Sequence, residues 1–167
     1  MRLKIEYDSA EAYTHPLSKT DVQLLRPLIV DSVMEKIAHI RFGCNQKTTQ
    51  EGRTVQRGPK FDIRVNFCVK SNQGLLLSTK SDYTKIIIRC GGKLDLKNNV
   101  VTWTSAGAKL YAAFLLLHEI GHIVHCDTYS GGQFNGSRPA NNEERWCDDF
   151  ALNLLPRAEK LLSIVGR

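Results

Sequence analysis

Two histidines and a glutamate in the second half of the chain form the segment His118-Glu119-Ile120-Gly121-His122, an H-E-x-x-H motif. The segment is predicted to be helical, and residues four apart in a helix lie one turn apart on the same face. Both imidazoles can therefore reach one ion, and zinc accepts imidazole nitrogen at about 2.0–2.1 Å. The neighbouring Glu119 carboxylate can take a proton from a water molecule at the metal without occupying the metal itself. The motif therefore predicts a catalytic zinc site.

The alternative is a chance H-E-x-x-H match on an ordinary helix, and the residues around the motif argue against it. The flanking positions are almost all apolar, from Leu115 to Leu117 and again at Ile120, Ile123 and Val124. Unpaired polar groups in a protein core carry a large free-energy cost. A metal, a water-filled cleft and further polar partners would remove that cost, so we favour the metal site.

Two histidines leave a zinc site incomplete, so a third protein ligand is expected. His125 follows His122 by three residues, but the helical rise places it about 10 Å from His118. We therefore expect His125 to cap the end of the helix or to pack near the site rather than to bind the metal. His15 and His39 are expected at surface or core positions.

An acidic segment at residues 141–151 offers the third ligand. Glu144 and Asp148 are four residues apart, so they share one helix face. Glu144 could bind the metal while Asp148 holds the distal N–H of a ligand imidazole. The alternative is a solvated acidic helix start, which the helix dipole favours. Because the segment follows an H-E-x-x-H helix after a short loop, we prefer the interpretation in which Glu144 binds the metal. If Cys126 or Cys147 also bound the metal, the open position of a catalytic site would be closed.

The two segments together resemble the ImmA/IrrE family of small zinc metallopeptidases, which belong to the gluzincins. The similarity covers residues 108–157 and rests on LLHEIGHIVH and EERWCDDFALNLLP, with Cys147 where the family pattern has alanine. The resemblance implies that His118, His122 and Glu144 are the zinc ligands and that Glu119 is the base. Asp148 stands at the position where the family pattern has Asn or Asp.

The resemblance also implies a cytosolic, regulatory, zinc-dependent metalloendopeptidase that cleaves a helix-turn-helix transcriptional repressor or a similar protein. Tyr129 is our candidate for stabilising the oxyanion, and His15 and Arg145 are further candidates. The same imidazole and carboxylate ligands also accept manganese, cobalt and iron. We expect the substrate to add a strand at a sheet edge beside the active helix, at residues 84–90 or 99–103.

The elements that must position these residues follow from hydrophobic periodicity and turn signals. Their order is strand, helix, three or four strands and then helices, which is typical of an α+β protein, and short connections favour a mostly antiparallel sheet. The resemblance implies the zincin-like arrangement of a compact gluzincin, with an N-terminal helix, a small sheet, the H-E-x-x-H helix and then a helix bearing the glutamate ligand. The predicted elements up to residue 103 are a strand at 2–7, a helix over 21–41 capped by Ser18 or Thr20 with a kink or a split start at Pro27, a loop at 43–60, and strands at 61–69, 75–78, 84–90 and 99–103. Those beyond residue 103 are a helix from about 106 to 125 capped by Ser105, and helices at 141–155 and 157–165 divided by Pro156.

Length and composition place these elements in one domain, residues 1–167, because 167 residues are enough for a single core. Hydrophobic residues make up 42% and charged residues 24%, which excludes a disordered or collagen-like chain. The longest apolar run, Leu110–Leu117, is shorter than the roughly 20 residues of a membrane span, so no membrane partner is expected. Five scattered cysteines without a C-x-x-C pair favour a reducing, cytoplasmic location.

Positive charge is concentrated in the middle of the chain. Residues 36–97 hold 13 basic and 4 acidic side chains, which suggests a face that attracts an acidic partner such as nucleic acid. The alternative is that these side chains are solvated positions on strands and loops. The second functional hypothesis is therefore a non-catalytic, zinc-containing module that binds nucleic acid or protein through a basic face, although structural zinc sites usually have four protein ligands.

Overall fold

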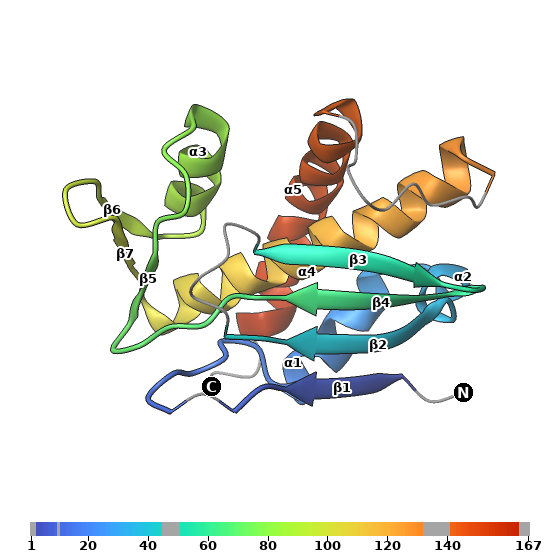
Figure 1. The fold of residues 1–167 in the computed structure, drawn as a ribbon, viewed down its shortest axis with the longest axis horizontal. Coiled ribbons are helices and arrows are strands. Elements are labelled where there is room, and N and C mark those ends of the chain that lie inside the picture. Colours follow the sequence, from blue (N-terminus) through green and yellow to red (C-terminus); the bar gives the residue numbers. More distant parts are fainter. Residues whose placement is uncertain (1–2, 10, 45–50, 132–140, 164–167) are drawn as a thin grey trace.

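Two β-sheets and the helices packed against them make up this mixed α and β protein (Figure 1). The computed structural model describes residues 3–9, 11–44, 51–131 and 141–163. The larger sheet has the strand order β1-β2-β4-β3 and the smaller sheet the order β5-β7-β6. The strands are β1 (Lys4–Tyr7), β2 (Ile37–Phe42), β3 (Gly52–Arg57), β4 (Lys60–Val65), β5 (Gln73–Leu75), β6 (Lys93–Asp95) and β7 (Val100–Thr102).

The larger sheet is mixed, so the prediction of a mostly antiparallel sheet is wrong for it. β1 pairs with β2, and β2 with β4, in parallel, and only β3 pairs antiparallel to its neighbour β4. The long excursion between β1 and β2 contains the N-terminal helices, which provide the crossover that a parallel pair requires. The smaller sheet is antiparallel throughout its described strands.

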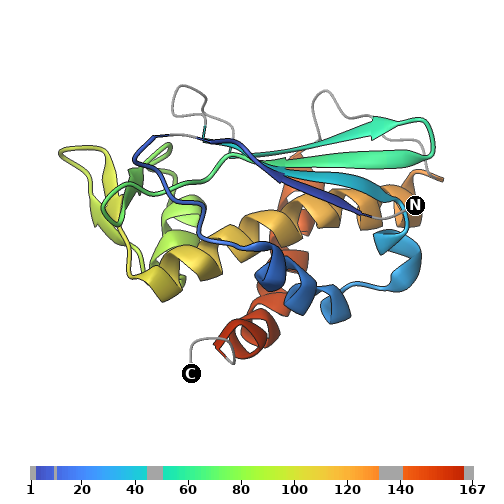
Figure 2. The same cartoon turned by 90° about the horizontal axis from the view of Figure 1, so that it is seen from below.

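The helices lie mainly on one face of the larger sheet. Figure 2 shows the long helix α4 beneath the sheet, with α5 crossing α4 on the side away from the strands. Residues on nearly every side of α4 are buried, which explains why its sequence is apolar almost all round. Among the described residues, no helix is both long and apolar enough to cross a membrane. The helices are α1 (Lys19–Leu25), the 3-10 turn η1 (Arg26–Leu28), α2 (Asp31–Met34), α3 (Ser81–Arg89), α4 (Ser105–Tyr129) and α5 (Asn141–Ser163).

The helix predicted over 21–41 is wrong as one element, and the chain is split at Pro27, which was one of the two alternatives for that residue. Ser18 caps α1 as expected, with its side chain accepting a hydrogen bond from the Asp21 amide at 3.1 Å. Pro27 then lies in η1, the chain becomes extended at Ile29 and Val30, and β2 begins within the predicted helix. Ile37 and Ile40 fit a helical spacing because a register shift in β2 gives the buried residues of this strand an irregular spacing.

The isoleucine run at 84–90 forms helix α3 and not a strand. β-branched residues favour strands only weakly, and packing decides between the alternatives. Here Ile86 and Ile87 are buried while Ile88 is exposed, which is a helical pattern of burial. The predicted strands at 61–69 and 99–103 correspond to the shorter strands β4 and β7. The strand predicted at 75–78 is wrong, because it shares only Leu75 with β5, and β6 was not predicted.

The segment 43–60, predicted as a loop, contains strand β3. Its residues are mostly polar because one face is open to solvent and the other carries Thr54. Residues 45–50 of this segment lie outside the described part of the chain.

Helices α4 and α5 are both longer than the sequence predicted. Thr104, rather than Ser105, caps α4 by accepting a hydrogen bond from the Gly107 amide at 3.0 Å. α5 continues through Pro156, where a break was expected. Pro156 lies on the exposed side, and Leu155 and Ala158 on the opposite side are buried, so packing holds the helix continuous.

Candidate metal centre

Helix α4 places the two histidines on one stripe of aromatic side chains. Going along α4, the rings of Tyr111, Phe114, His118 and His122 follow one another with centroids 6.2, 6.2 and 5.0 Å apart. The spacing of three or four residues keeps all four side chains on one helix face. Ligand atoms of His118, Glu119 and His122 lie within 4.8 Å of one another, so the described residues contain one cluster suited to a cation.

Glu144 of α5 faces both imidazoles from across the helix interface. Its Oε2 lies 3.2 Å from Nε2 of His118, and its Oε1 lies 3.6 Å from Nε2 of His122. The two helices can approach this closely because of Gly121, where an added Cβ would lie 3.2 Å from the Cα of Cys147. The structure therefore brings together the three side chains that the sequence singled out as ligands.

The other ring nitrogen of each histidine contacts a further carboxylate of α5. Nδ1 of His118 lies 2.8 Å from Oδ1 of Asp148, which is the contact we expected of that residue. Nδ1 of His122 lies 2.8 Å from Oε1 of Glu143. With Nδ1 facing these carboxylates, each ring turns its Nε2 toward Glu144.

Glu143 was not predicted from the sequence. The signal was present, because Glu143 and Glu144 are adjacent acids about 100° apart around one helix, and two histidines on a facing helix can each meet one of them. Only the packing of α4 on α5 shows which acid meets which ring.

We expect Glu143→Gln and Asp148→Asn each to weaken zinc binding by about 10- to 100-fold, because each carboxylate orients a ring and raises its basicity. Zinc affinity can be measured by competition with a chromophoric chelator at constant pH. Asp149→Asn, which alters an exposed acid on the same helix, is the control. Affinities equal to that of the control would show that the two contacts do not support metal binding.

The electrostatics of the cluster favour a positive charge between the rings. Burial by itself lowers the pKa of His118, but its hydrogen bonds with Asp148 and Glu144 outweigh burial and raise the pKa to about 10. The hydrogen bond with His118 lowers the pKa of Glu144. Burial raises the pKa of Glu119, which lies between the histidines and the sheet.

Strand β3 provides the wall on the other side of Glu119. The hydroxyl of Thr54 lies 2.7 Å from Oε2 of Glu119, and both residues are buried. At Gly52, an added Cβ would lie only 2.7 Å from the Glu119 Cδ. Neither residue was predicted to belong to the site, because the sequence placed both in a loop.

The other candidates lie away from the cluster. His125 packs against aromatic rings near the end of α4, with its ring centroid 4.8 Å from that of Tyr129 and 5.3 Å from that of Trp146. Tyr129 is seven residues beyond His122, or about 10 Å along the helix, and its side chain is 64% exposed. Its role with an oxyanion therefore stays a prediction, as does that of the exposed Arg145.

His15 and the cysteines do not join this cluster either. Nε2 of His15 lies 2.8 Å from the backbone oxygen of Asp8, next to β1 at the far edge of the sheet from β3. Cys126 and Cys147 are buried, and burial raises the pKa of both thiols, which disfavours the thiolate that binds metals.

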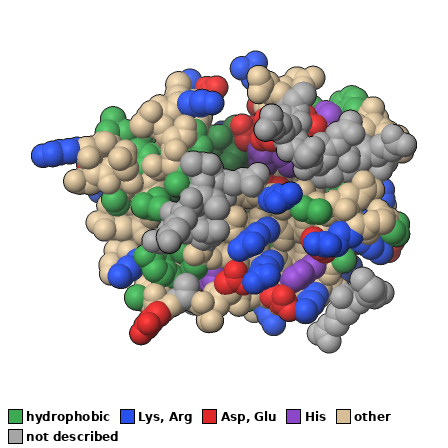
Figure 3. All heavy atoms as spheres, in the orientation of Figure 1, with side chains coloured by type: hydrophobic (Ala, Val, Ile, Leu, Met, Phe, Trp, Pro, Cys, Tyr) green, Lys and Arg blue, Asp and Glu red, His purple; other side chains and the backbone are tan. Residues whose placement is uncertain are grey.

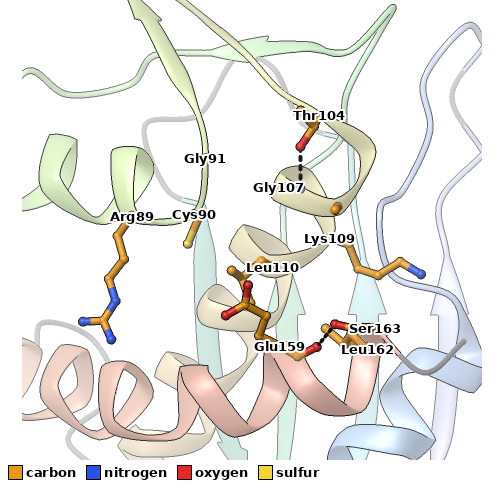
Figure 4. A pocket seen from close by; sticks show the side chains of 11 residues that line it. Arg89, Cys90, Gly91, Thr104, Gly107, Lys109, Leu110, Glu159, Leu162 and Ser163 are labelled. Carbon is orange, nitrogen blue, oxygen red and sulfur yellow. Dashed lines mark hydrogen bonds between the residues drawn. The ribbon is translucent and has the colours of Figure 1, made fainter. Parts of the chain in front are cut away.

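Figure 3 shows histidine and acidic side chains together in a hollow of the surface, over α4 and between α3 and α5. A separate pocket of about 300 Å³ lies at the start of α4, lined among others by Arg89, Leu110 and Glu159 (Figure 4). Leu110 precedes His118 by eight residues, or about 12 Å of helix, so this pocket is distinct from the candidate centre. Lys109 at its rim forms an ion pair with Asp21 at 3.0 Å.

The donor set fits a zinc ion. Two neutral imidazole nitrogens and one carboxylate are a ligand set of catalytic zinc sites, which keep a fourth position for water or substrate. Both Nε2 atoms already face the Glu144 carboxylate, and both Nδ1 atoms are held from behind. The three residues that would hold the ion are therefore oriented before it binds.

Comparisons with protein-family models, with curated proteins and with solved structures found no match to this chain. The function of this chain is therefore inferred from its sequence motif and from the geometry of the residues around it.

Proposed function

We propose that the protein is a zinc-dependent metalloendopeptidase of gluzincin type. The observation that carries the proposal is the position of Glu144, whose two oxygens lie 3.2 and 3.6 Å from the Nε2 atoms of His118 and His122. A third ligand on a second helix, with a buried glutamate next to the first histidine, is the arrangement that the resemblance to the ImmA/IrrE family implies. The order of the sheet, α4 and α5 along the chain also agrees with it.

The chain's own residues would divide the reaction among them. His118, His122 and Glu144 would hold the zinc ion, which when bound supplies Lewis-acid polarisation of a carbonyl and lowers the pKa of water toward about 7. Glu119 would accept a proton from the attacking water and pass it to the leaving amine. The raised pKa of Glu119, caused by burial, suits a group that must both take and release a proton.

The substrate would lie along β3 and not along the segments predicted from the sequence. Residues 84–90 form a helix, and β7 is the central strand of the smaller sheet, so neither is an available edge. β3 is an edge strand of the larger sheet, and its residues Gly52 and Thr54 contact Glu119. An extended peptide could pair with β3 through its backbone and place its carbonyl beside Glu119.

The class of substrate follows from the resemblance alone. By that likeness the substrate is a protein such as a helix-turn-helix repressor, cut at specific bonds by a regulatory, cytoplasmic enzyme. All five cysteines lie in the described part of the chain and none of them is in a disulfide there, which agrees with a reducing compartment.

The experiment for this proposal is a search for zinc-dependent cleavage in a peptide library derived from a whole proteome. The zinc-loaded protein is incubated with the library, and new peptide ends are identified by mass spectrometry with and without a chelator. We expect new ends that are absent after zinc removal. Identical peptide ends in both samples would contradict the proposal.

A second candidate function, binding of nucleic acid, is favoured by the open face of the larger sheet. Arg41, Arg64 and Arg53 are neighbours in one row across β2, β4 and β3. Asp8 forms ion pairs with Arg41 at 2.7 Å and Arg64 at 3.5 Å, which offset only part of this charge. Figure 3 shows several Lys and Arg side chains over this part of the molecule. Like charges side by side favour an anionic partner.

Electrophoretic mobility shift with random duplex DNA at low salt tests this second function. We expect retardation by the wild-type protein, weaker retardation by Arg53→Glu, and loss of retardation as salt is raised. Lys97→Glu, an exposed charge reversal in the turn between β6 and β7, is the control. Absence of retardation at low salt would leave the arginine row as a solvated sheet face.

A further inference from the structure

Thr54 is one of the few buried polar side chains among the described residues. Only Asp21, Thr54, Glu119 and His122 are in this class there, and the last two belong to the candidate centre. Thr54 is 4% exposed, on the side of β3 that faces α4. A hydroxyl buried against a helix destabilises the fold unless it makes a hydrogen bond, and valine would fill the same space without that requirement.

Both hydrogen bonds that the structure gives to the Thr54 hydroxyl end on Glu119. Its Oγ1 lies 2.7 Å from Oε2 of the side chain and 3.0 Å from the backbone oxygen of the same residue. The hydroxyl has one hydrogen to donate, and an ionised carboxylate is the stronger of these two acceptors. Thr54 thus fixes one oxygen of the Glu119 carboxylate.

Gly52 leaves the space in which the other carboxylate oxygen of Glu119, Oε1, lies. An added Cβ at Gly52 would meet Oε1 first, and it would also lie 2.7 Å from Cδ and 2.9 Å from Cγ of Glu119. The backbone of Gly52 is not among the positive-φ positions, so conformational freedom does not explain the glycine. The glycine is explained by the Glu119 side chain, which occupies the space that a Cβ at position 52 would need.

We propose that Thr54 is a positioning residue for the base Glu119, holding its carboxylate at the edge of β3 in the space that Gly52 leaves open. This inference rests on the proposed peptidase function and adds to it a requirement on β3. β3 then does two things: its edge pairs with the substrate, and its inward side chains set the direction of the base. A displacement of about 1 Å in a reacting group can reduce turnover by about 100-fold.

The first test compares Thr54→Val with Thr54→Ser on a peptide that the wild-type enzyme cleaves. We expect Thr54→Val to lower kcat by about 10- to 100-fold with KM and zinc affinity unchanged, and Thr54→Ser to restore most of kcat. Gly52→Ala should lower kcat in the same way, because its methyl group displaces the carboxylate. Thr102→Val, which removes an exposed hydroxyl from β7, is the matched control. A kcat of Thr54→Val equal to that of this control would overturn the inference.

The second test needs neither zinc nor substrate. Thermal unfolding of the metal-free protein is measured for Thr54→Val, Glu119→Leu and the double variant. We expect Thr54→Val to lower Tm clearly when Glu119 is present and little when leucine replaces it, because the lost hydrogen bond joins these two side chains. Equal changes in Tm in both backgrounds would overturn the inference. Failure of the wild-type enzyme to cleave any peptide would instead overturn the proposed function, while coupling in Tm would still establish the contact.

Discussion

Glu119→Gln is expected to reduce the rate of peptide cleavage by about 100- to 10,000-fold while zinc remains bound. Glutamine keeps the size of the side chain and can still accept the hydrogen bond from Thr54, but it cannot take a proton from water. None of the three proposed ligands is altered, so zinc affinity should stay within a few-fold of wild type. Cleavage is measured on a peptide from the library screen, and zinc by chelator competition.

Glu35→Gln is the matched control, because it makes the same chemical change at an exposed position after α2. It should cleave at the wild-type rate. Near-normal cleavage by Glu119→Gln would remove Glu119 from the role of base. Loss of zinc from that variant would instead show that Glu119 binds the metal. Its carboxylate is close enough for this, because the ligand atoms of His118, Glu119 and His122 lie within 4.8 Å of one another.

Glu144→Ala is expected to weaken zinc binding by more than about 100-fold. Loss of a residue that hydrogen-bonds to a metal ligand lowers metal affinity by about 10- to 100-fold, and removal of the ligand itself should lower zinc affinity further. The variant should also lose the rise in Tm that zinc gives the wild-type protein, since a ligand that binds only the folded state stabilises that state. Differential scanning fluorimetry with added zinc measures this rise.

Asp149→Ala is the control for Glu144→Ala, because it removes an exposed carboxylate from the same helix. X-ray absorption of the zinc-loaded wild-type protein gives an independent check, with nitrogen and oxygen neighbours expected at about 2.0–2.1 Å. A sulfur neighbour near 2.3 Å would identify Cys126 or Cys147 as a ligand and favour the binding module. Unchanged zinc affinity in Glu144→Ala would contradict the proposed centre.

The mixed α and β class and the helices that carry the candidate site were predictable from short-range patterns. The H-E-x-x-H spacing defines which side chains share a face of α4, because helical geometry is the same wherever the helix lies. The separation of Glu144 and Asp148 on α5 is local in the same sense. The alternation in β4 also identified its buried face, with Phe61, Ile63 and Val65 inside.

Errors arose where packing overrides local preference. The isoleucines of α3 favour a strand by propensity, yet the structure places them on a helix beside the smaller sheet, with Ile86 and Ile87 buried and Ile88 exposed. Pro156 predicts a helix break, yet the buried residues Leu155 and Ala158, which precede and follow it in the sequence, keep α5 continuous. In both cases the deciding contacts are made with segments distant in the sequence, which local patterns do not contain.

Residue types and their spacing along the chain define the chemistry available to this protein: two imidazoles on one helix face, an adjacent carboxylate, and a second acidic helix. The contact of Glu143 with His122, and the contacts of Thr54 and Gly52 in β3 with Glu119, became visible only in the folded chain. Spacing along a helix is fixed by backbone hydrogen bonds within it. The approach of a helix to a strand, by contrast, depends on the packing of the whole core.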